Sequence, residues 1–227
     1  MRDRRDSVIF RDRRHAGQVL AHRLGLLAGC PNTLVLGLPR GGVPVAYEVA
    51  QGIAAPLDVL LVRKLGVPGQ EELAMGAVAP GGHIVLNGDV VRHLRIGQPV
   101  IDAVARDELA ELNRRERLYR GGRPRPAVKD QTVILVDDGL ATGSTMRAAA
   151  QVLKQQGPER LIVAVPVAAQ STCDALAAEV DEVICVSTPD PFHAVGLWYE
   201  NFSQTTDEEV QHLLTEAAER TAGWCQR

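Results

Sequence analysis

The stretch VILVDDGLATGST, residues 133–145, gives the clearest indication of how this chain folds. Its first four residues are apolar, which predicts a buried strand. Two adjacent carboxylates, Asp137 and Asp138, follow at the end of that strand, because the interior of a core strand does not tolerate them. A run of small and hydroxyl-bearing residues then begins a helix, and it comprises Ala141, Thr142, Gly143, Ser144 and Thr145.

The chemistry of this stretch suits a sugar phosphate. Carboxylates accept hydrogen bonds, so Asp137 and Asp138 fit vicinal hydroxyls, directly or through a divalent cation. Unpaired main-chain N–H groups at the start of a helix, together with the helix dipole, favour a phosphate dianion. Hydroxyls followed by a phosphate describe a ribose 5-phosphate. The stretch lacks the Gly-Lys-Ser/Thr of a Walker loop and the glycine spacing of the dinucleotide fingerprint; the alternative is an acidic turn that caps a helix.

Apolar runs outside this stretch predict further strands and helices in alternation. The expected strands are Thr33–Leu38, Leu57–Val62, Ala74–Val78, His83–Leu86, Thr132–Val136, Leu161–Val167 and Glu182–Val186. The expected helices are Asp12–Ala28, Val43–Gln51, Val100–Tyr119, Met146–Gln156, Thr172–Glu179 and Thr206–Ala222. Such alternation implies right-handed crossovers, and therefore an α/β fold with a doubly wound, mostly parallel sheet and helices on both faces.

Three loops follow the ends of expected strands: Pro39–Gly42, Arg63–Gly69 and Asp137–Thr145. Ligands gather at the carboxyl ends of parallel strands, so we expect these loops to meet at one cleft. Two glycines and a proline within residues 63–69 predict a mobile loop. Residues 65–72 would then be able to close over the cleft as a lid.

Residues 133–145 resemble the signature with which type I phosphoribosyltransferases bind 5-phosphoribosyl-1-pyrophosphate (PRPP): an apolar strand, two acids and a Thr-Gly-x-Thr loop. The resemblance implies a type I phosphoribosyltransferase fold with a small hood, accompanied here by an extra helical segment at residues 100–125. It also implies magnesium as a cofactor and a homodimer. The order of elements from Thr33 to Thr145 agrees with it, whereas Gly139 stands where the family usually has an aliphatic residue.

The resemblance also implies roles for particular residues. The loop at 141–145 would bind the 5-phosphate, while Asp137 and Asp138 would hold the ribose and touch Mg²⁺, directly or through water. The family's pyrophosphate loop is matched by Pro39, Arg40, Gly41 and Gly42, and the pair that starts the flexible loop of adenine enzymes is matched by Arg63 and Lys64. The catalytic residues implied are Asp137, Asp138, Lys64 and Arg40.

The acceptor is less clearly indicated. Residues 192–202 faintly resemble the base-stacking segment of the 6-oxopurine enzymes, so Phe192, Trp198 and Tyr199 are candidate faces for a flat acceptor. The equal alternative is that these aromatic residues anchor the C-terminal segment to the core.

Two further positions bear on the acceptor. Ala141 stands where the 6-oxopurine enzymes carry an acid, which disfavours hypoxanthine and guanine. Adenine enzymes use a glutamate outside the PRPP loop. Glu71 and Glu72 are candidates for that role, or are simply solvated loop charges.

The composition is that of an ordinary globular chain, with 227 residues, 45% hydrophobic and 23% charged. It fits a single domain at 1–227, with a core at about 12–188 and a hood and helix at about 189–222. A net charge of −3 and no helix-turn-helix pattern disfavour DNA as a partner, while RNA is less readily excluded. Four scattered cysteines, a charged N-terminus without a signal sequence, and no apolar run of about 20 residues predict a cytoplasmic protein that does not enter the membrane.

The function expected is a pentosyltransferase that moves the phosphoribosyl group of PRPP to a nitrogen acceptor, a nucleobase or related aromatic, and releases pyrophosphate. The alternative is a non-catalytic regulator on the same fold that senses PRPP or a nucleotide. Arg40, Lys64 and both carboxylates favour turnover, because a sensor could lose its leaving-group contacts. PRPP synthesis is disfavoured, since this short chain shows no ATP site. The sequence assigns no role to the histidines, including His15, His83 and His193.

Overall fold

The computed structural model describes residues 8–224, with side chains to residue 221. Its centre is a five-stranded parallel sheet in the order β2-β1-β6-β7-β8. The chain runs from β1 (Thr33–Gly37) outward to β2 (Leu57–Val59) and then returns to the other side of β1 with β6 (Thr132–Val136), β7 (Arg160–Val167) and β8 (Glu182–Ser187). The winding therefore reverses between β1 and β6, and in open sheets of this type the ligand crevice lies at the carboxyl ends of the strands at such a reversal.

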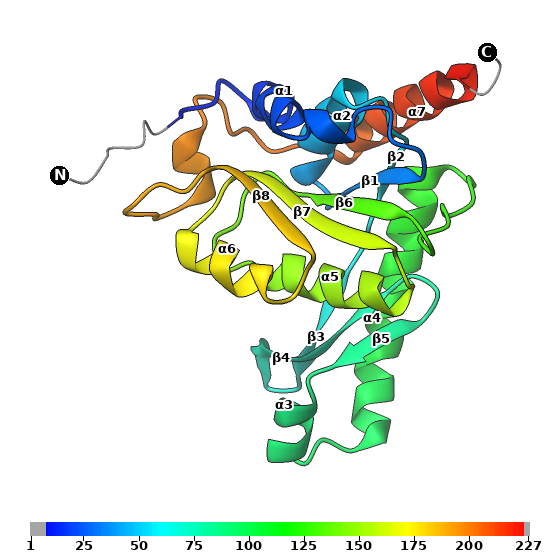
Figure 1. Ribbon diagram of the computed structural model, residues 1–227. Coiled ribbons are helices and arrows are strands. Elements are labelled where there is room, and N and C mark those ends of the chain that lie inside the picture. The colour runs from blue at the N-terminus through cyan, green and yellow to red at the C-terminus, as the bar shows by residue number, and fades with distance from the viewer. Residues whose placement is uncertain (1–7, 225–227) are drawn as a thin grey trace.

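Helices cover both faces of this sheet (Figure 1). α1 (Arg13–Arg23), α2 (Gly42–Gly52) and α7 (Asp207–Trp224) lie on one face, and α5 (Ser144–Gln155) and α6 (Gln170–Ala177) lie on the other. Alternate strand side chains enter two separate apolar clusters, one beneath each helix layer, because successive residues of a strand point to opposite faces. The α/β, doubly wound, mostly parallel fold expected from the sequence is confirmed.

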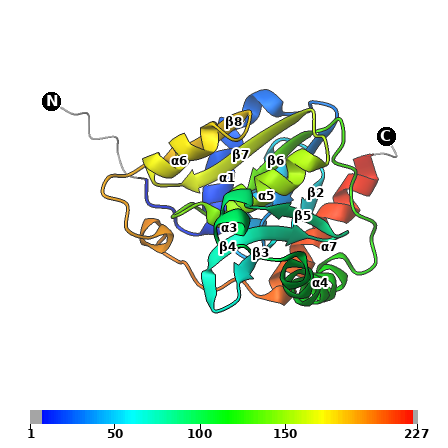
Figure 2. The same ribbon diagram turned by 90° about the horizontal axis from the view of Figure 1, so that it is seen from below.

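A second, antiparallel sheet of three strands projects from the α5 side (Figures 1 and 2). It consists of β3 (Arg63–Val67), β4 (Gln70–Ala79) and β5 (His83–Leu86), and it is followed by α3 (Gly88–His93) and the long α4 (Gln98–Arg120). β3 and β4 contact both α4 and α5, and α4 also contacts α7. The extra helical segment expected from the sequence therefore joins the small sheet to the helix layer of the large one.

The loop expected at residues 63–69 is a hairpin instead, because these residues form β3 and the turn that leads into β4. Pro68 and Gly69 make that turn, and Gly69 has a φ of +79°. Gly66 lies at a shift in register, where a Cβ would be 2.8 Å from the carbonyl oxygen of Glu71. Glycine and proline are as typical of tight hairpin turns as of loops, so local composition did not separate the two.

Several element ends differ from those expected. The first helix ends at Arg23 and is followed by the 3₁₀ turn η1 (Gly25–Leu27). The second strand ends at Val59 instead of Val62, and α5 begins at Ser144 instead of Met146. The short helix α3 and the 3₁₀ turn η2 (Val195–Trp198) were not expected.

The cysteines that the structure describes, Cys30, Cys173 and Cys185, are free thiols. Cys225 and residues 1–7, with which the charged N-terminal segment begins, lie outside the described residues. Within residues 8–224, no helix combines the length and the apolar character needed to cross a membrane.

Candidate functional site

Asp137 and Asp138 follow directly after strand β6, at the point where the winding of the sheet reverses. Oδ2 of Asp138 accepts a 2.8 Å hydrogen bond from Nε of Arg13 in α1, and the two side chains are 16% and 12% exposed. Oδ1 of Asp137 accepts a 2.9 Å hydrogen bond from the main-chain N–H of Asp138. The hydroxyl of Tyr199 donates to the carbonyl oxygen of Asp138 at 2.5 Å. The acid pair is therefore held by two distant segments, α1 and the C-terminal segment, and by its own main chain.

Burial raises the pKa of both carboxyl groups. The nearby charge of Asp138 raises the pKa of Asp137 further, so that it lies well above its ordinary value. The hydrogen bond and the charge of Arg13 oppose the effect of burial on the pKa of Asp138. The main-chain N–H of Asp138 and the charge of Arg13 offset this effect on the pKa of Asp137 only in part.

The loop after β1 packs directly against the acid pair. A Cβ on Gly41 would collide with Oδ2 of Asp138, and a Cβ on Gly42 would lie 3.0 Å from Oδ1 of Asp137 and 2.7 Å from the carbonyl oxygen of Val136. Glycine fits both positions without displacing the carboxylates. The structure therefore brings the predicted pyrophosphate loop, in which the peptide bond between residues 39 and 40 is cis, to the predicted ribose site.

The loop that leads into α5 is braced by the start of α6. Oγ1 of Thr172 donates to the carbonyl oxygen of Ala141 at 2.7 Å. Gly143 occupies the N-cap position with a φ of +68°, and a Cβ there would lie 2.6 Å from Cγ2 of Thr172. The cap residue offers no side chain to the helix, and the first turn carries no acid. The main-chain N–H of Ser144 makes a long, 3.4 Å hydrogen bond to Oγ1 of Thr142, and the other N–H groups of the first turn can bind an anion.

The side chain of Arg40 lies beside the start of α7. Its Nη1 is 4.0 Å from Oδ1 of Asp207, and both side chains are 38% exposed. The same oxygen of Asp207 accepts a 2.6 Å hydrogen bond from the hydroxyl of Tyr119 in α4. Burial and this carboxylate raise the pKa of Tyr119 to about 12. Arg40 thus has one loose anionic neighbour and remains accessible to a ligand at the end of β1.

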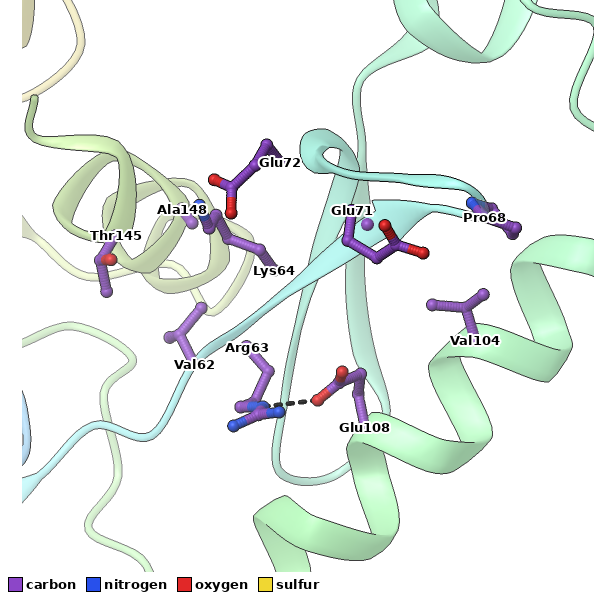
Figure 3. A pocket seen from close by; sticks show the side chains of 11 residues that line it. Val62, Arg63, Lys64, Pro68, Glu71, Glu72, Val104, Glu108, Thr145 and Ala148 are labelled. Atoms are coloured by element: carbon purple, nitrogen blue, oxygen red, sulfur yellow. Dashed lines mark hydrogen bonds and ion pairs between the residues drawn. The ribbon is translucent and has the colours of Figure 1, made fainter.

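A cavity of about 560 Å³ lies between the hairpin, α4 and the start of α5 (Figure 3). Arg63 points toward α4 and pairs with Glu108 at 2.5 Å. Lys64 leaves β3 in another direction, toward α5, and lines the cavity together with Thr145 of the predicted phosphate loop. The lining is completed by Val62, Gly66, Pro68, Glu71, Glu72, Val104 and Ala148. Lys64 is therefore next to the phosphate loop, whereas the charge of Arg63 is already compensated.

The candidate acceptor residues lie mainly against the core. Tyr199 is buried, with its ring centroid 5.5 Å from that of Phe10 and 4.9 Å from that of Phe202. Trp198 and Phe192 are half-buried beside the same apolar cluster. The hydroxyl of Tyr199 already has a main-chain partner, so of the three residues it is the least free to meet a ligand.

The C-terminal segment also explains the glycine at position 139. A Cβ on Gly139 would lie 2.6 Å from Cγ1 of Val195 and 3.0 Å from the carbonyl oxygen of Val167. An aliphatic side chain at this position would therefore push the segment away from the end of β6. The departure from the family pattern makes room for the segment that carries the aromatic residues.

Sequence reasoning missed Arg13, the partner of Asp138, and the two residues that Arg13 contacts in the C-terminal segment, Phe202 and Ser203. Arg13 stands in a run of charged residues, where a solvated side chain is the ordinary expectation. Its partner Asp138 is 125 positions away in the chain. The apolar spacing of the first helix was the one available signal, and it places Arg13 on a helix without indicating what the side chain contacts.

The carboxylates provide hard oxygen donors of the kind that Mg²⁺ prefers. Within residues 8–224, however, no three His, Cys, Asp or Glu side chains gather into a metal site. One oxygen each of Asp137 and Asp138 is already engaged in a hydrogen bond. The pair therefore fits an ion that takes most of its ligands from a bound substrate or from water.

Comparison with known proteins agrees with this geometry. The family model described as "Phosphoribosyl transferase domain" matches residues 20–200. In each of two strains of Mycobacterium tuberculosis, a protein provisionally named a phosphoribosyl transferase is 49% identical over 209 residues, which cover 92% of this chain and 47% of the relative. This chain thus spans about half the length of those curated relatives.

A solved structure agrees over almost its whole length. The crystal structure of the protein TT1426 from Thermus thermophilus is 47% identical in sequence and has a TM-score of 0.84. The match covers 92% of this chain and 99% of that one. The resemblance expected from residues 133–145 is therefore confirmed, and the chain belongs to the phosphoribosyl transferase domain family.

Proposed function

We propose that this chain is a pentosyltransferase that moves the 5-phosphoribosyl group of PRPP to a nitrogen acceptor, a nucleobase or related aromatic, and releases pyrophosphate. The observation that carries the proposal is the packing of the 39–42 loop against Asp137 and Asp138, at the reversal point of the sheet. The helix start at 141–145 follows directly. These three groups suit the pyrophosphate, the ribose hydroxyls and the 5-phosphate of one PRPP molecule.

Each group has a task in the proposed reaction. The bond from C1 of the ribose to a pyrophosphate oxygen breaks, and a bond from C1 to the acceptor nitrogen forms, through an oxocarbenium-like state. The proton of the acceptor nitrogen passes to the released pyrophosphate or to water. Asp137 and Asp138 hold the ribose hydroxyls, while Arg40 and Lys64 stabilise the charge that develops on the leaving pyrophosphate. Excluding water protects the reactive carbon, and we assign this task to the hairpin that carries Lys64, since Lys64 lines a cavity together with Thr145.

Magnesium belongs to the same proposal. Bound together with PRPP, Mg²⁺ would offset the negative charge of the pyrophosphate. Asp137 and Asp138 would hold the ion, directly or through water. The adjacent carboxylates support this role because they offer the oxygen ligands that Mg²⁺ prefers, and a cation would favour the charged form of Asp137, whose pKa burial and the charge of Asp138 raise.

We propose that the acceptor is not hypoxanthine or guanine, since Ala141 offers no acid to a 6-oxopurine. Phe192 and Trp198 are the proposed faces for a flat acceptor. Tyr199 is the weaker candidate, because its hydroxyl donates a hydrogen bond to the carbonyl oxygen of Asp138 and its ring packs on Phe202.

We further propose that the enzyme works as a homodimer in the cytoplasm. The cysteines are scattered along the sequence without a Cys-x-x-Cys pair, which supports a reducing compartment. Light scattering on the purified protein tests the dimer, and a monomer mass with full activity would contradict it.

The central test is a calorimetric titration of the wild-type protein with PRPP in the presence and absence of Mg²⁺. The double variant Asp137→Asn, Asp138→Asn should fail to bind PRPP. The matched control changes another adjacent acid pair, Glu208→Gln with Glu209→Gln; these side chains are exposed on α7, and the control should bind normally. A coupled assay of pyrophosphate release with a panel of nucleobases then identifies the acceptor.

These measurements distinguish the proposed enzyme from a non-catalytic regulator. Unchanged PRPP affinity in the Asp137, Asp138 double variant would remove these residues from the site. Magnesium-dependent PRPP binding without release of pyrophosphate in the presence of any tested acceptor would favour the non-catalytic regulator. If the wild-type protein does not bind PRPP, the proposed function fails as a whole.

A further inference from the structure

Arg13 is nearly buried, although it stands among charged residues at the start of α1. Its Nε donates to Oδ2 of Asp138 at 2.8 Å, and its Nη1 donates to the carbonyl oxygen of Ser203 at 2.6 Å. The central carbon of its guanidinium lies 3.9 Å from the ring centroid of Phe202. A single side chain therefore joins the acid pair to the C-terminal segment.

Helix α1 is seated firmly enough to hold Arg13 in this place. The side chain of Asp12 caps the helix by accepting a 2.8 Å hydrogen bond from the main-chain N–H of His15. One turn after Arg13, a Cβ on Gly17 would lie 2.6 Å from the carbonyl oxygen of Val45 in α2. The two helices thus pack in close contact, which fixes the direction from which Arg13 reaches the end of β6.

The loop after β1 closes on the same ion pair. A Cβ on Gly41 would lie 3.1 Å from Nε of Arg13 and would collide with Oδ2 of Asp138. The first helix, the loop at 39–42, the acid pair and the C-terminal segment therefore meet at one guanidinium. Arg13, Phe202 and Ser203 all lie outside residues 20–200, which match the family model.

We propose that Arg13 is a positioning residue for Asp138: it occupies Oδ2 and leaves the other carboxylate oxygen to accept a ribose hydroxyl. The inference rests on the proposed function, because it assigns a role at the same site. The planar fork of a guanidinium donates in two fixed directions at once, so it holds Asp138 and Ser203 in one geometry. Lysine is a point charge and does not hold both partners in this way.

The test compares Arg13→Met and Arg13→Lys with a matched control, Arg14→Met. Arg14 is the next residue, carries the same charge, is 55% exposed and pairs with Glu48 away from the acid pair. Three probes are titrated calorimetrically: PRPP with Mg²⁺, ribose 5-phosphate, and inorganic phosphate. The first two probes engage the ribose site, whereas inorganic phosphate needs only the loop at 141–145.

Arg13→Met should weaken binding of PRPP and of ribose 5-phosphate about 30-fold, as expected for the loss of a charge-assisted hydrogen bond. Arg13→Lys should recover part of this loss and remain about 5-fold weaker than wild type. Arg14→Met should stay within about twofold, because its partner, the buried carboxylate of Glu48, lies on α2 and not at the acid pair. Inorganic phosphate should bind all four proteins equally.

Equal affinity of Arg13→Met and wild type for ribose 5-phosphate would overturn the inference. A parallel loss of inorganic phosphate binding would also overturn it, since the variant would then disturb the whole site and not the ribose contacts alone. If Arg13→Met does not fold, the same comparison is made with Arg13→Lys: its affinity for ribose 5-phosphate should fall while its affinity for inorganic phosphate stays that of the wild type. The wild-type protein could bind ribose 5-phosphate with a dependence on Arg13 and yet not bind PRPP. That result would contradict the proposed function and support the positioning role of Arg13.

Discussion

Replacing each of the two adjacent acids at the end of β6 by asparagine should have different effects on the stability of the ligand-free protein. Asp138→Asn removes the anionic partner of Arg13 and leaves a largely buried guanidinium without its counter-charge. Asp137→Asn removes a charge that burial and the neighbouring carboxylate already disfavour, as the raised pKa of Asp137 indicates. The asparagine carbonyl can still accept the hydrogen bond from the main-chain N–H of residue 138.

The magnitude follows from the exposure of the ion pair. With Arg13 12% and Asp138 16% exposed, the pair is close to a buried one, and breaking such a pair costs about 3 kcal/mol. In a chain of 227 residues each kcal/mol lowers Tm by roughly 2–4 °C. Asp138→Asn should therefore lower Tm by about 6–12 °C. Asp137→Asn should leave Tm unchanged or raise it.

Differential scanning calorimetry of both variants at neutral pH without ligand provides the measurement. Titration with PRPP and Mg²⁺ should show that both variants lose affinity. Asp137→Asn should therefore lose binding without losing stability, whereas Asp138→Asn should lose both. An equal drop of Tm in the two variants would refute the reasoning, because it would mean that Asp137 is as well compensated as Asp138.

Two other predictions concern the glycine loop and α4. Gly41→Ala places a Cβ 2.8 Å from Cγ of Asp138, so it should lower the free energy of unfolding by about 1–3 kcal/mol and weaken PRPP binding. Gly25→Ala is the control, because a Cβ there meets open space. Equal effects of the two variants would contradict the close packing at Gly41. The hydrogen bond from Arg125 lowers the pKa of Glu116, so the stability that this carboxylate provides is present above its ordinary pKa of 4.5 and is lost as pH falls below it. Glu116→Gln should flatten the fall of Tm below pH 4.5, and an unchanged acid limb in Tm measurements would speak against this role.

The part of the site that could be predicted is the part that is continuous in the chain. Residues 133–145 combine an apolar strand, two acids and a glycine-containing helix start, and each of these depends on neighbours only a few positions away. The loop at 39–42 was also predicted, because the end of a buried strand is visible in the apolar pattern. The hairpin at 63–79 was missed in part, since its turn uses the same residues as a loop.

The amino-acid sequence by itself determined the alternation of strands and helices, the position of Asp137 and Asp138 at a strand end, and the helix start that follows them. These features arise from hydrogen bonds and side-chain periodicity within one element, so they can be recognised without knowing what packs against it. Tertiary structure alone decided that Arg13 meets Asp138 and that Gly41 lies against the same carboxylate. These contacts join segments far apart in the chain, and they exist because α1 is seated on α2 and because β1 and β6 are neighbours in the sheet.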